Sequence, residues 1–194
     1  MPVTANDMPN YRYGVRGMKL SCLGANDTYE TPWIENGIET VDESGRASTN
    51  STTFYSDDGK PATVPGATGN DTMTVTAAEF SDDYQTKVMG HTKDATTGAI
   101  VKRKSDEANT FAAGWEVQGT LRRTRIWKTG ITSSEPAAAA FQTKGENVSE
   151  SPESATWTIN GDEFICHEGE DGFATFLDAV PTAPAAAATT GNGN

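Results

Sequence analysis

The chain has 194 residues, a net charge of −12, and 35% apolar residues. This length suffices for one domain with a core, and the abundant Gly, Thr, Ser, Asn and Asp are typical of β proteins with long polar loops. No apolar run reaches the length of a membrane span. The polar start, Met1 to Asn10, predicts no signal peptide. The overall acidity disfavours tight nucleic-acid binding, which requires Lys and Arg against the phosphates.

The charge is divided into three blocks along the chain. Residues 1–100 carry a balance of −7, residues 101–144 a balance of +4, and residues 145–194 a balance of −9. A charged block is most often a solvated face. Blocks of opposite sign also permit head-to-tail contact between copies of one chain.

The first half of the chain predicts short strands joined by long polar segments. Residues 1–13 predict a polar N-terminal arm, and the alternating residues 17–23 predict a half-buried strand. Residues 33–41 predict one strand or, because Asn36-Gly37 is a turn signal, two short strands. Residues 43–70 are rich in Ser, Thr, Gly, Asp and Pro, and a loop of this length inside a domain is usually functional or mobile.

A strand and a short helix follow the long loop. Apolar residues alternate with threonines over residues 71–80, which predicts a strand. Residues 82–89 predict a short α-helix, capped by Ser81 or Asp82 and ended by Gly90. Because this helix has few turns, packing must hold it in place.

The rest of the chain returns to the β pattern. Strands are predicted over residues 99–102, 110–118, 120–128, 155–159 and 163–166. The dipeptide Asn160-Gly161 predicts a hairpin between the last two strands. Both faces of the strand 120–128 carry charge, so neither face is expected to be buried in a lone monomer.

Two features are expected near the C-terminus. The apolar residues between Phe173 and Leu177 predict either one turn of helix or a last strand. Residues 181–194 are rich in Ala, Thr, Pro and Gly, which predicts a flexible tail.

No catalytic or metal-binding pattern is present in the sequence, which predicts a protein that is not an enzyme and needs no cofactor. Cys22 and Cys166 predict two buried or half-buried thiols, or a disulfide only if their strands are neighbours. His91 predicts a cap or packing residue, and His167 a surface residue. The motif Asp57-Asp58-Gly59 lacks the other ligands of a calcium loop.

A basic cluster surrounds Trp127 in the strand 120–128. Arg122, Arg123 and Arg125 beside an aromatic residue could bind single-stranded nucleic acid by stacking. One aromatic residue in an acidic protein makes a poor stacking platform, however. A contact with an acidic partner subunit is therefore the preferred interpretation.

Several short segments occur in a characteristic order over residues 14–167. They are Phe54–Gly59, Ala78–Ser81 followed by a helix that ends at Met89-Gly90-His91, Arg125–Lys128, Ser134–Pro136 and Phe141–Glu146. In this order the segments resemble the major tail proteins (tail tube proteins) of long-tailed, siphovirus-type bacteriophages, in particular the group that infects Gram-positive bacteria. No single segment is diagnostic, because each is short.

The resemblance implies a mainly β fold, a β-sandwich or barrel-like tail tube domain over residues 14–180 with one flanking helix. Subunits of this family form hexameric rings, and the rings stack into a hollow tube that carries the viral genome into the host. The inner strands of neighbouring subunits join into one barrel. Residues 43–70 would then form a stacking loop, and residues 1–13 a docking arm.

The resemblance also implies the partners and the location. The partners would be further copies of the chain and the tape measure, tail terminator and distal tail proteins. Viral DNA would pass through the lumen without sequence-specific binding, and no membrane would be involved. The protein would assemble in the host cytoplasm and end in the virion tail. The residues predicted to make inter-subunit contacts are Tyr11, Tyr13, Phe54, Tyr55, Asp57, Asp58, Arg122, Arg123, Arg125 and Trp127.

An alternative function is an extracellular or cell-surface β-sandwich binding module. Polar loops and N-x-S/T sequences at Asn26, Asn50, Asn70 and Asn147 favour it. The expected lack of a signal peptide and of an aromatic binding cluster disfavours it. An enzyme ranks third, because no acid, base or nucleophile pair is visible.

Overall fold

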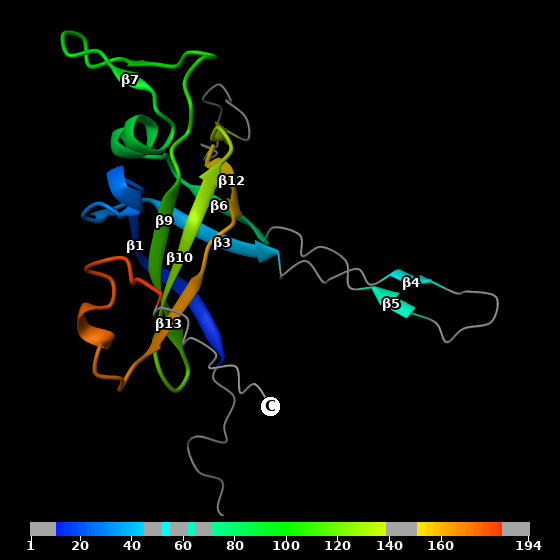
Figure 1. The fold of residues 1–194 in the computed structure, drawn as a ribbon. Helices are drawn as coiled ribbons and strands as arrows, with labels where there is room; N and C mark the ends of the chain where they lie inside the picture. The colour runs from blue at the N-terminus through cyan, green and yellow to red at the C-terminus, as the bar shows by residue number, and fades with distance from the viewer. Residues whose placement is uncertain (1–10, 45–51, 55–61, 65–70, 139–150, 184–194) are drawn as a thin grey trace, which may run out of the picture.

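The computed structural model describes residues 11–44, 52–54, 62–64, 71–138 and 151–183. In this part of the chain, nine strands form one antiparallel sheet, and the fold is mainly β, as the sequence predicts (Figure 1). Two small two-stranded sheets stand apart from it: β4 (Thr52–Phe54) pairs with β5 (Ala62–Val64), and β7 (Thr92–Lys93) pairs with β8 (Ile100–Val101).

The strands of the main sheet are β1 (Arg12–Cys22), β2 (Trp33–Ile34), β3 (Ile38–Ser44), β6 (Asp71–Ala77), β9 (Phe111–Gly119), β10 (Thr124–Ser133), β11 (Ala137–Ala138), β12 (Glu153–Ile159) and β13 (Glu163–His167). Their hydrogen-bonded order is β2-β1-β9-β10-β12-β6-β3, with β13 also on β10 and β11 on β12. Three helical turns are η2 (Ala25–Asp27), η3 (Tyr84–Val88) and η4 (Phe173–Thr175).

A glycine corner bends the sheet where β10 changes partner. Residues Thr124–Lys128 of β10 pair with β13, whereas Ile131–Ser133 pair with β12. Gly130 has a φ of +62°, and a Cβ on it would lie 2.7 Å from the amide nitrogen of Gly161. Only glycine tolerates this left-handed backbone and this close approach together.

The predicted hairpin at Asn160-Gly161 is wrong. β12 and β13 both run antiparallel to β10, so they continue in one direction on either side of a bulge. The bulge is held by hydrogen bonds from the Asn160 amide to the Gly130 carbonyl and from the Thr129 amide to the Asp162 carbonyl, at 3.1 and 3.0 Å. A bulge of this kind lets one strand pass from one part of a sheet to another.

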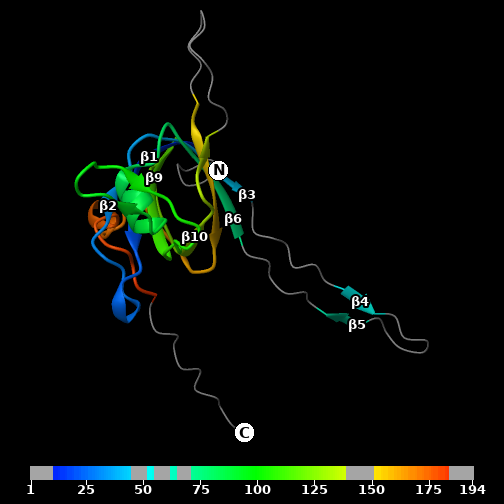
Figure 2. The ribbon, with the colours of Figure 1, turned by 90° about the horizontal axis from the view of Figure 1, so that it is seen from above.

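The corner divides the main sheet into two halves that enclose the core. The β9 half contains β2, β1, β9, β13 and Thr124–Lys128 of β10. The β6 half contains β3, β6, β12, β11 and Ile131–Ser133 of β10. Figure 2 shows β1 and β9 on one side and β3 and β6 on the other. Large side chains that are almost fully buried between the halves include Met18, Leu20, Met73, Phe111, Trp115, Ile126, Ile131 and Trp157.

The helix predicted over residues 82–89 is present, but it is not a regular α-helix: Asp82 and Asp83 are α-helical and lead into the π-helical turn η3. The amide of Met89 donates to the carbonyl of Tyr84 at 3.1 Å, and Ser81 caps the turn by accepting from the Tyr84 amide. The fully buried Tyr84 hydroxyl contacts the Ser133 hydroxyl at 2.6 Å and accepts from Trp157 Nε1 at 3.0 Å. This polar anchor in the core fixes a turn too short to be stable alone.

β1 begins at Arg12, inside the segment predicted as an arm and before the predicted strand of residues 17–23. Gly14 and Gly17 have φ values of +69° and +62°, and the register with β9 shifts at both places. These bulges interrupt the two-residue alternation, which is why the pattern does not predict the start of the strand.

Two open alternatives are settled by the structure. Residues 33–41 form two strands, because Gly37 turns the chain with a φ of +83° between β2 and β3. These strands pair with β1 and β6 and not with each other. The segment between Phe173 and Leu177 contains the helical turn η4 and no strand.

Replacing Gly130 by Ala is expected to lower the free energy of unfolding by roughly 2–4 kcal/mol, because a Cβ would meet the Gly161 backbone in a left-handed conformation. Urea unfolding measures the change. Gly172→Ala is the matched control, because Gly172 has a φ of −82° and open space around it. Equal losses in the two variants would contradict the role of the corner.

Candidate functional site: the outer faces of the two sheet halves

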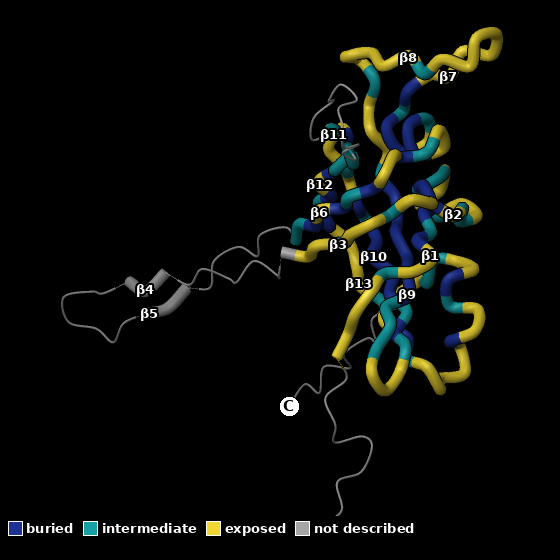
Figure 3. The backbone as a smooth tube through the Cα atoms, turned by 180° about the vertical axis from the view of Figure 1, so that it is seen from behind, coloured by how far each residue is buried: buried dark blue, intermediate teal, exposed yellow. Residues whose placement is uncertain are grey.

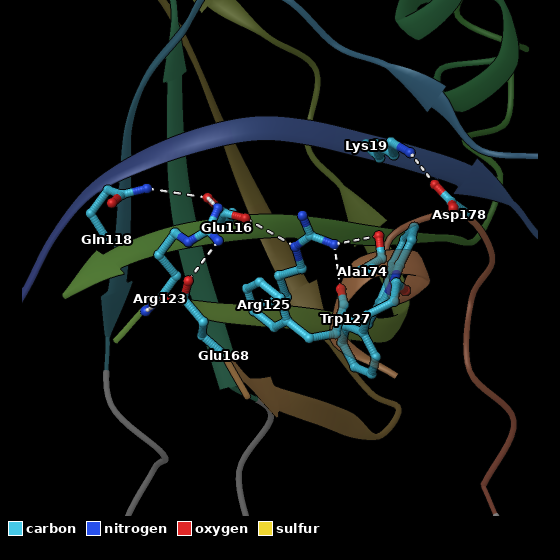
Figure 4. Close-up of polar contacts among 11 residues, drawn as sticks. Lys19, Glu116, Gln118, Arg123, Arg125, Trp127, Glu168, Ala174 and Asp178 are labelled. Atoms are coloured by element: carbon cyan, nitrogen blue, oxygen red, sulfur yellow. Dashed lines mark hydrogen bonds and ion pairs between the residues drawn. The ribbon is translucent and has the colours of Figure 1, made fainter. Parts of the chain in front are cut away.

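A ladder of charged side chains crosses the outer face of the β9 half (Figure 4). Strand register places Arg16 of β1 opposite Glu116 of β9, and Glu116 opposite Arg125 of β10. Glu116 accepts a hydrogen bond from Arg125 Nε at 2.9 Å, and its carboxylate lies 3.6 Å from Arg123 Nη1. Only 8% of the Glu116 side chain is exposed, and the two arginines are the charge partners that a buried carboxylate requires.

The C-terminal segment covers this charged face. Arg125 donates to two carbonyl oxygens of η4, and its guanidinium lies 4.4 Å from the centroid of the Phe173 ring. The indole of Trp127 is fully buried, and its Nε1 donates to the Phe176 carbonyl at 2.8 Å. A Cβ at Gly114 would lie 2.5 Å from the Trp127 ring, so the glycine makes room for the indole.

The expectation that neither face of the strand 120–128 is buried in a monomer is therefore wrong. Ile126 is buried toward the core, and Trp127 is buried on the opposite face beneath the C-terminal segment. The partners of the arginines come from a segment that is distant in sequence and gives no periodic signal, so pattern alone does not reveal the burial.

Three of the predicted inter-subunit contacts are engaged within the chain. Arg123 donates from Nη2 to Glu168 at 2.7 Å, and Arg125 and Trp127 hold the C-terminal segment as described above. These intrachain bonds give the three residues a structural role in the monomer.

The other predicted contacts lie elsewhere. Tyr11 and Tyr13, at the start of β1, are 67% and 59% exposed, and Arg122 is on the surface of the β9–β10 turn. Phe54 belongs to β4. The remaining predicted contacts, Tyr55, Asp57 and Asp58, lie outside the described residues.

A shallow cleft lies beside the ladder, between β1 and the C-terminal segment. Its charged lining consists of Arg16, Lys19, Glu116, Arg123, Arg125 and Asp178. Lys19 Nζ pairs with Asp178 at 3.1 Å. Arg16 is exposed at this cleft, and within the described residues it forms no hydrogen bond or ion pair.

The outer face of the β6 half is covered by hydroxyl side chains. Register aligns Thr74 of β6 with Asp42 of β3 and with Thr156 of β12. The flanking rows are Thr40, Thr76 and Ser154 on one side, and Thr72, Thr158 and Thr132 on the other. We call these three rows of side chains together the hydroxyl face: Thr40, Asp42, Thr72, Thr74, Thr76, Thr132, Ser154, Thr156 and Thr158. Among them Asp42 is the single ionisable residue, and none is Lys or Arg.

The hydroxyl face is open to solvent, whereas its reverse builds the core. Thr40, Asp42, Thr74, Thr132 and Thr156 are all exposed. The residues that alternate with the hydroxyls are almost completely buried: Met73, Val75, Ala77, Ala155 and Trp157. The sequence shows the alternation in single strands, but the face arises only when three strands are paired in register.

β3 forms an open edge of the main sheet. Within the described residues it bonds only with β6, and Figure 3 shows it crossing the molecule as a largely exposed strand. Glu39, Asp42 and Glu43 on this strand are exposed. An unpaired edge presents N–H and C=O groups that can pair with another chain.

His91 has a structural position. Its ring is almost fully buried, with Nδ1 at 2.9 Å from Asp106 Oδ2 and Nε2 at 3.1 Å from Glu135 Oε2. Lys102 Nζ also donates to Glu135, at 2.6 Å. These bonds tie the segment that carries β7 and β8 to the end of β10, which confirms the predicted packing role. His167, predicted on the surface, is half-buried.

The two cysteines are free, buried and on opposite faces of the sheet, which confirms the first of the two alternatives. Cys22 belongs to the core cluster, and burial raises the pKa of its thiol to about 11. Cys166 lies opposite Arg125 on the outer face of the β9 half, and burial also raises its pKa.

The described residues contain no group of three side chains placed to hold a metal ion. In the same part of the chain, every helix is too short or too polar to span a membrane.

No protein-family model and no curated protein matches the chain. Two solved structures of an extracellular contractile injection system are similar. A chain of the PVC sheath–tube complex in the extended state has 9% identity and a TM-score of 0.46, with 84% of this chain and 94% of that chain covered. A chain of the PVC sheath/tube terminator in the extended state has 10% identity and a TM-score of 0.40, with 80% and 97% covered.

The bond between Arg123 and Glu168 predicts a specific acid sensitivity. Hydrogen bonds from Arg123 lower the pKa of Glu168 from 4.5 to about 2. A carboxyl group whose pKa is lower in the folded state stabilises the fold above its unfolded pKa, and this contribution is lost as the pH falls from about 4.5 toward 2.

The measurement is the thermal unfolding temperature as a function of pH, from about pH 2 to about pH 6, which spans the titration of carboxyl groups. We expect Glu168→Gln to be less stable than the wild type at the upper end and to approach it at the lower end. Glu107→Gln, at an exposed position, is the matched control. Parallel curves for the wild type and Glu168→Gln would contradict the prediction.

Proposed function

We propose that the chain is a structural subunit of a phage-like tail tube. In this proposal, copies assemble into hexameric rings, and the rings stack into a hollow conduit for genome delivery into a host. The observation that carries the proposal is the open edge at β3, in a sheet whose other end is covered only by the two residues of β2.

An open edge strand of seven residues must either pair with another strand or carry features that prevent aggregation. Charged side chains on β3 discourage indiscriminate pairing, because like charges repel when two such edges meet. The same charges favour a partner edge of opposite sign. Arg12 and Arg16 lie on the part of β1 that precedes its pairing with β2, and both are exposed. Contact between two different surfaces is heterologous, and such contacts close into rings or grow into filaments.

The sequence resemblance to major tail proteins supports the ring and tube form of this assembly. The segments that carry it in the described part, Ala78–Ser81 with η3, Arg125–Lys128 and Ser134–Pro136, belong to the turn above the core and to the two ends of β10. Residues 1–13 are proposed as a docking arm, residues 43–70 as the stacking loop, and residues 181–194 as a flexible tail.

The proposed partners follow from the proposed role. They are further copies of the chain and the tape measure, tail terminator and distal tail proteins. DNA passes through the lumen without sequence-specific binding. Assembly takes place in the host cytoplasm, and the finished protein resides in the virion tail. Tyr11, Tyr13 and Arg122 remain the proposed contacts that lie on the described surface.

The oligomeric state tests the proposal directly. We expect the purified chain to form rings or tubes of uniform diameter in negative-stain microscopy, with a matching high-mass species in light scattering. Raising the salt concentration should weaken the assembly, because opposite charges meet across the contact. A strictly monomeric protein at every concentration and salt tested would overturn the proposal.

Deleting residues 45–68 separates folding from stacking. Ser44 and Thr72 are register partners on adjacent strands, so the remaining Gly69-Asn70 can join β3 to β6 by a short turn. We expect the variant to unfold near the wild-type temperature and to form single rings that do not stack. Tubes of normal length from this variant would show that the stacking element lies elsewhere.

A further inference from the structure

We propose that the hydroxyl face lines the lumen of the assembled tube, where it offers the passing polyanion a wall without cations. The inference rests on the proposed function and names the surface of the subunit that faces the DNA.

The two outer faces of the subunit differ in charge. The outer face of the β9 half carries Lys19, Arg16, Arg123 and Arg125. The hydroxyl face carries no Lys or Arg, and its single ionisable group is the carboxylate of Asp42. The outward side chains of β3, β6 and β12 therefore contrast in charge with the outer face of the β9 half.

A wall along which DNA moves must not bind phosphates tightly. Proteins hold DNA chiefly by setting Lys and Arg against phosphates, which releases condensed counterions. Neutral hydroxyls release none, and part of their bonding capacity is used within the face, where Thr76 Oγ1 and Ser154 Oγ lie 3.0 Å apart. Asp42 adds weak repulsion. A wall of this chemistry stays hydrated and lets a phosphate backbone slide.

The hydroxyl face lacks the side chains on which a protein–protein contact would be centred. Stable interfaces are centred on buried aromatic, Met or Arg side chains. The hydroxyl face has none of these, and its exposed members are Thr40, Asp42, Thr74, Thr132 and Thr156. Threonine is β-branched and favours strands, so it stabilises a strand without adding a large apolar surface on the solvent side.

The hydroxyl face lies beside the edge at which copies are proposed to join. β3 is both the open edge of the sheet and the outer strand of the hydroxyl face, where its Thr40 and Asp42 align with Thr76 and Thr74. A neighbour that joins at this edge therefore borders the hydroxyl face. Repetition around a ring would place one hydroxyl face from each copy around the lumen.

Cysteine accessibility in assembled tubes tests the orientation. Thr74→Cys and Thr156→Cys place a thiol on the hydroxyl face, and Asp171→Cys places one at an exposed position beside η4 on the opposite outer side. The native thiols are buried, and their raised pKa keeps them poorly reactive. Each tube is treated with N-ethylmaleimide and with a maleimide on a large branched polyethylene glycol.

We expect cysteines on the hydroxyl face to react with the small reagent and not with the large one, because only the small reagent diffuses along the lumen. Asp171→Cys should react with both. Reaction of Thr74→Cys and Thr156→Cys with both reagents would place the face outside the tube. Protection from both reagents, or loss of assembly in both variants while Asp171→Cys assembles, would make it a contact surface. Either result overturns this inference and leaves the proposed function intact, whereas a monomeric wild type overturns the proposed function itself.

A charge variant gives an independent readout. Tubes of Thr74→Lys should retain short duplex DNA at low salt and release it as salt rises, because a ring of lysines would then face the phosphates. Thr74→Gln, which adds length without charge, is the matched control and should retain none. Equal retention by the wild type, Thr74→Lys and Thr74→Gln would contradict a lumenal position.

Discussion

The close approach of Gly130 and Gly161 is the constraint on which the rest of the structure depends. Because neither residue has a side chain, β10 can pair with β13 before this point and with β12 after it. One sheet thereby becomes two halves around a single core. It also acquires two outer faces that need not resemble each other, and their chemistry differs: one carries a charged ladder, the other rows of hydroxyls.

The charged ladder is a means of fastening the C-terminal segment. Glu116 is nearly buried and would be costly without the arginines beside it, and Arg125 in turn donates to the carbonyl oxygens of Phe173 and Ala174 in η4. Trp127 completes the attachment through its indole N–H and its packing over Gly114. Charges that look like a binding surface in the sequence are thus largely used inside the monomer, and Arg16 remains for contacts outside it.

Local pattern predicts much of the fold and little of its pairing. Alternation identifies β6 and β12, because each strand has one face in the core. The turn at Gly37 is also visible in the sequence. The bulge at Asn160-Gly161 has the composition of a hairpin turn, and only the long-range partners on β10 decide that the chain continues straight. The hydroxyl face escapes prediction for the same reason, since it requires the register of β3, β6 and β12 together.

Assembly and passage place opposite demands on charge in the proposed tube. Edges that pair specifically need charges of opposite sign, whereas a wall along which DNA moves must avoid positive charge. Strand alternation and the glycine corner separate these demands in space. The cations gather on β1 and on the outer face of the β9 half, and the threonines of β6 and β12 face the other way. β3 serves both assembly and passage. Glu39 and Asp42 give its edge a negative charge, which attracts a basic neighbouring strand and does not bind the phosphate backbone of DNA. An acidic edge strand next to a hydroxyl wall is therefore one consistent solution, in which the residues that attract the next subunit do not hold the DNA.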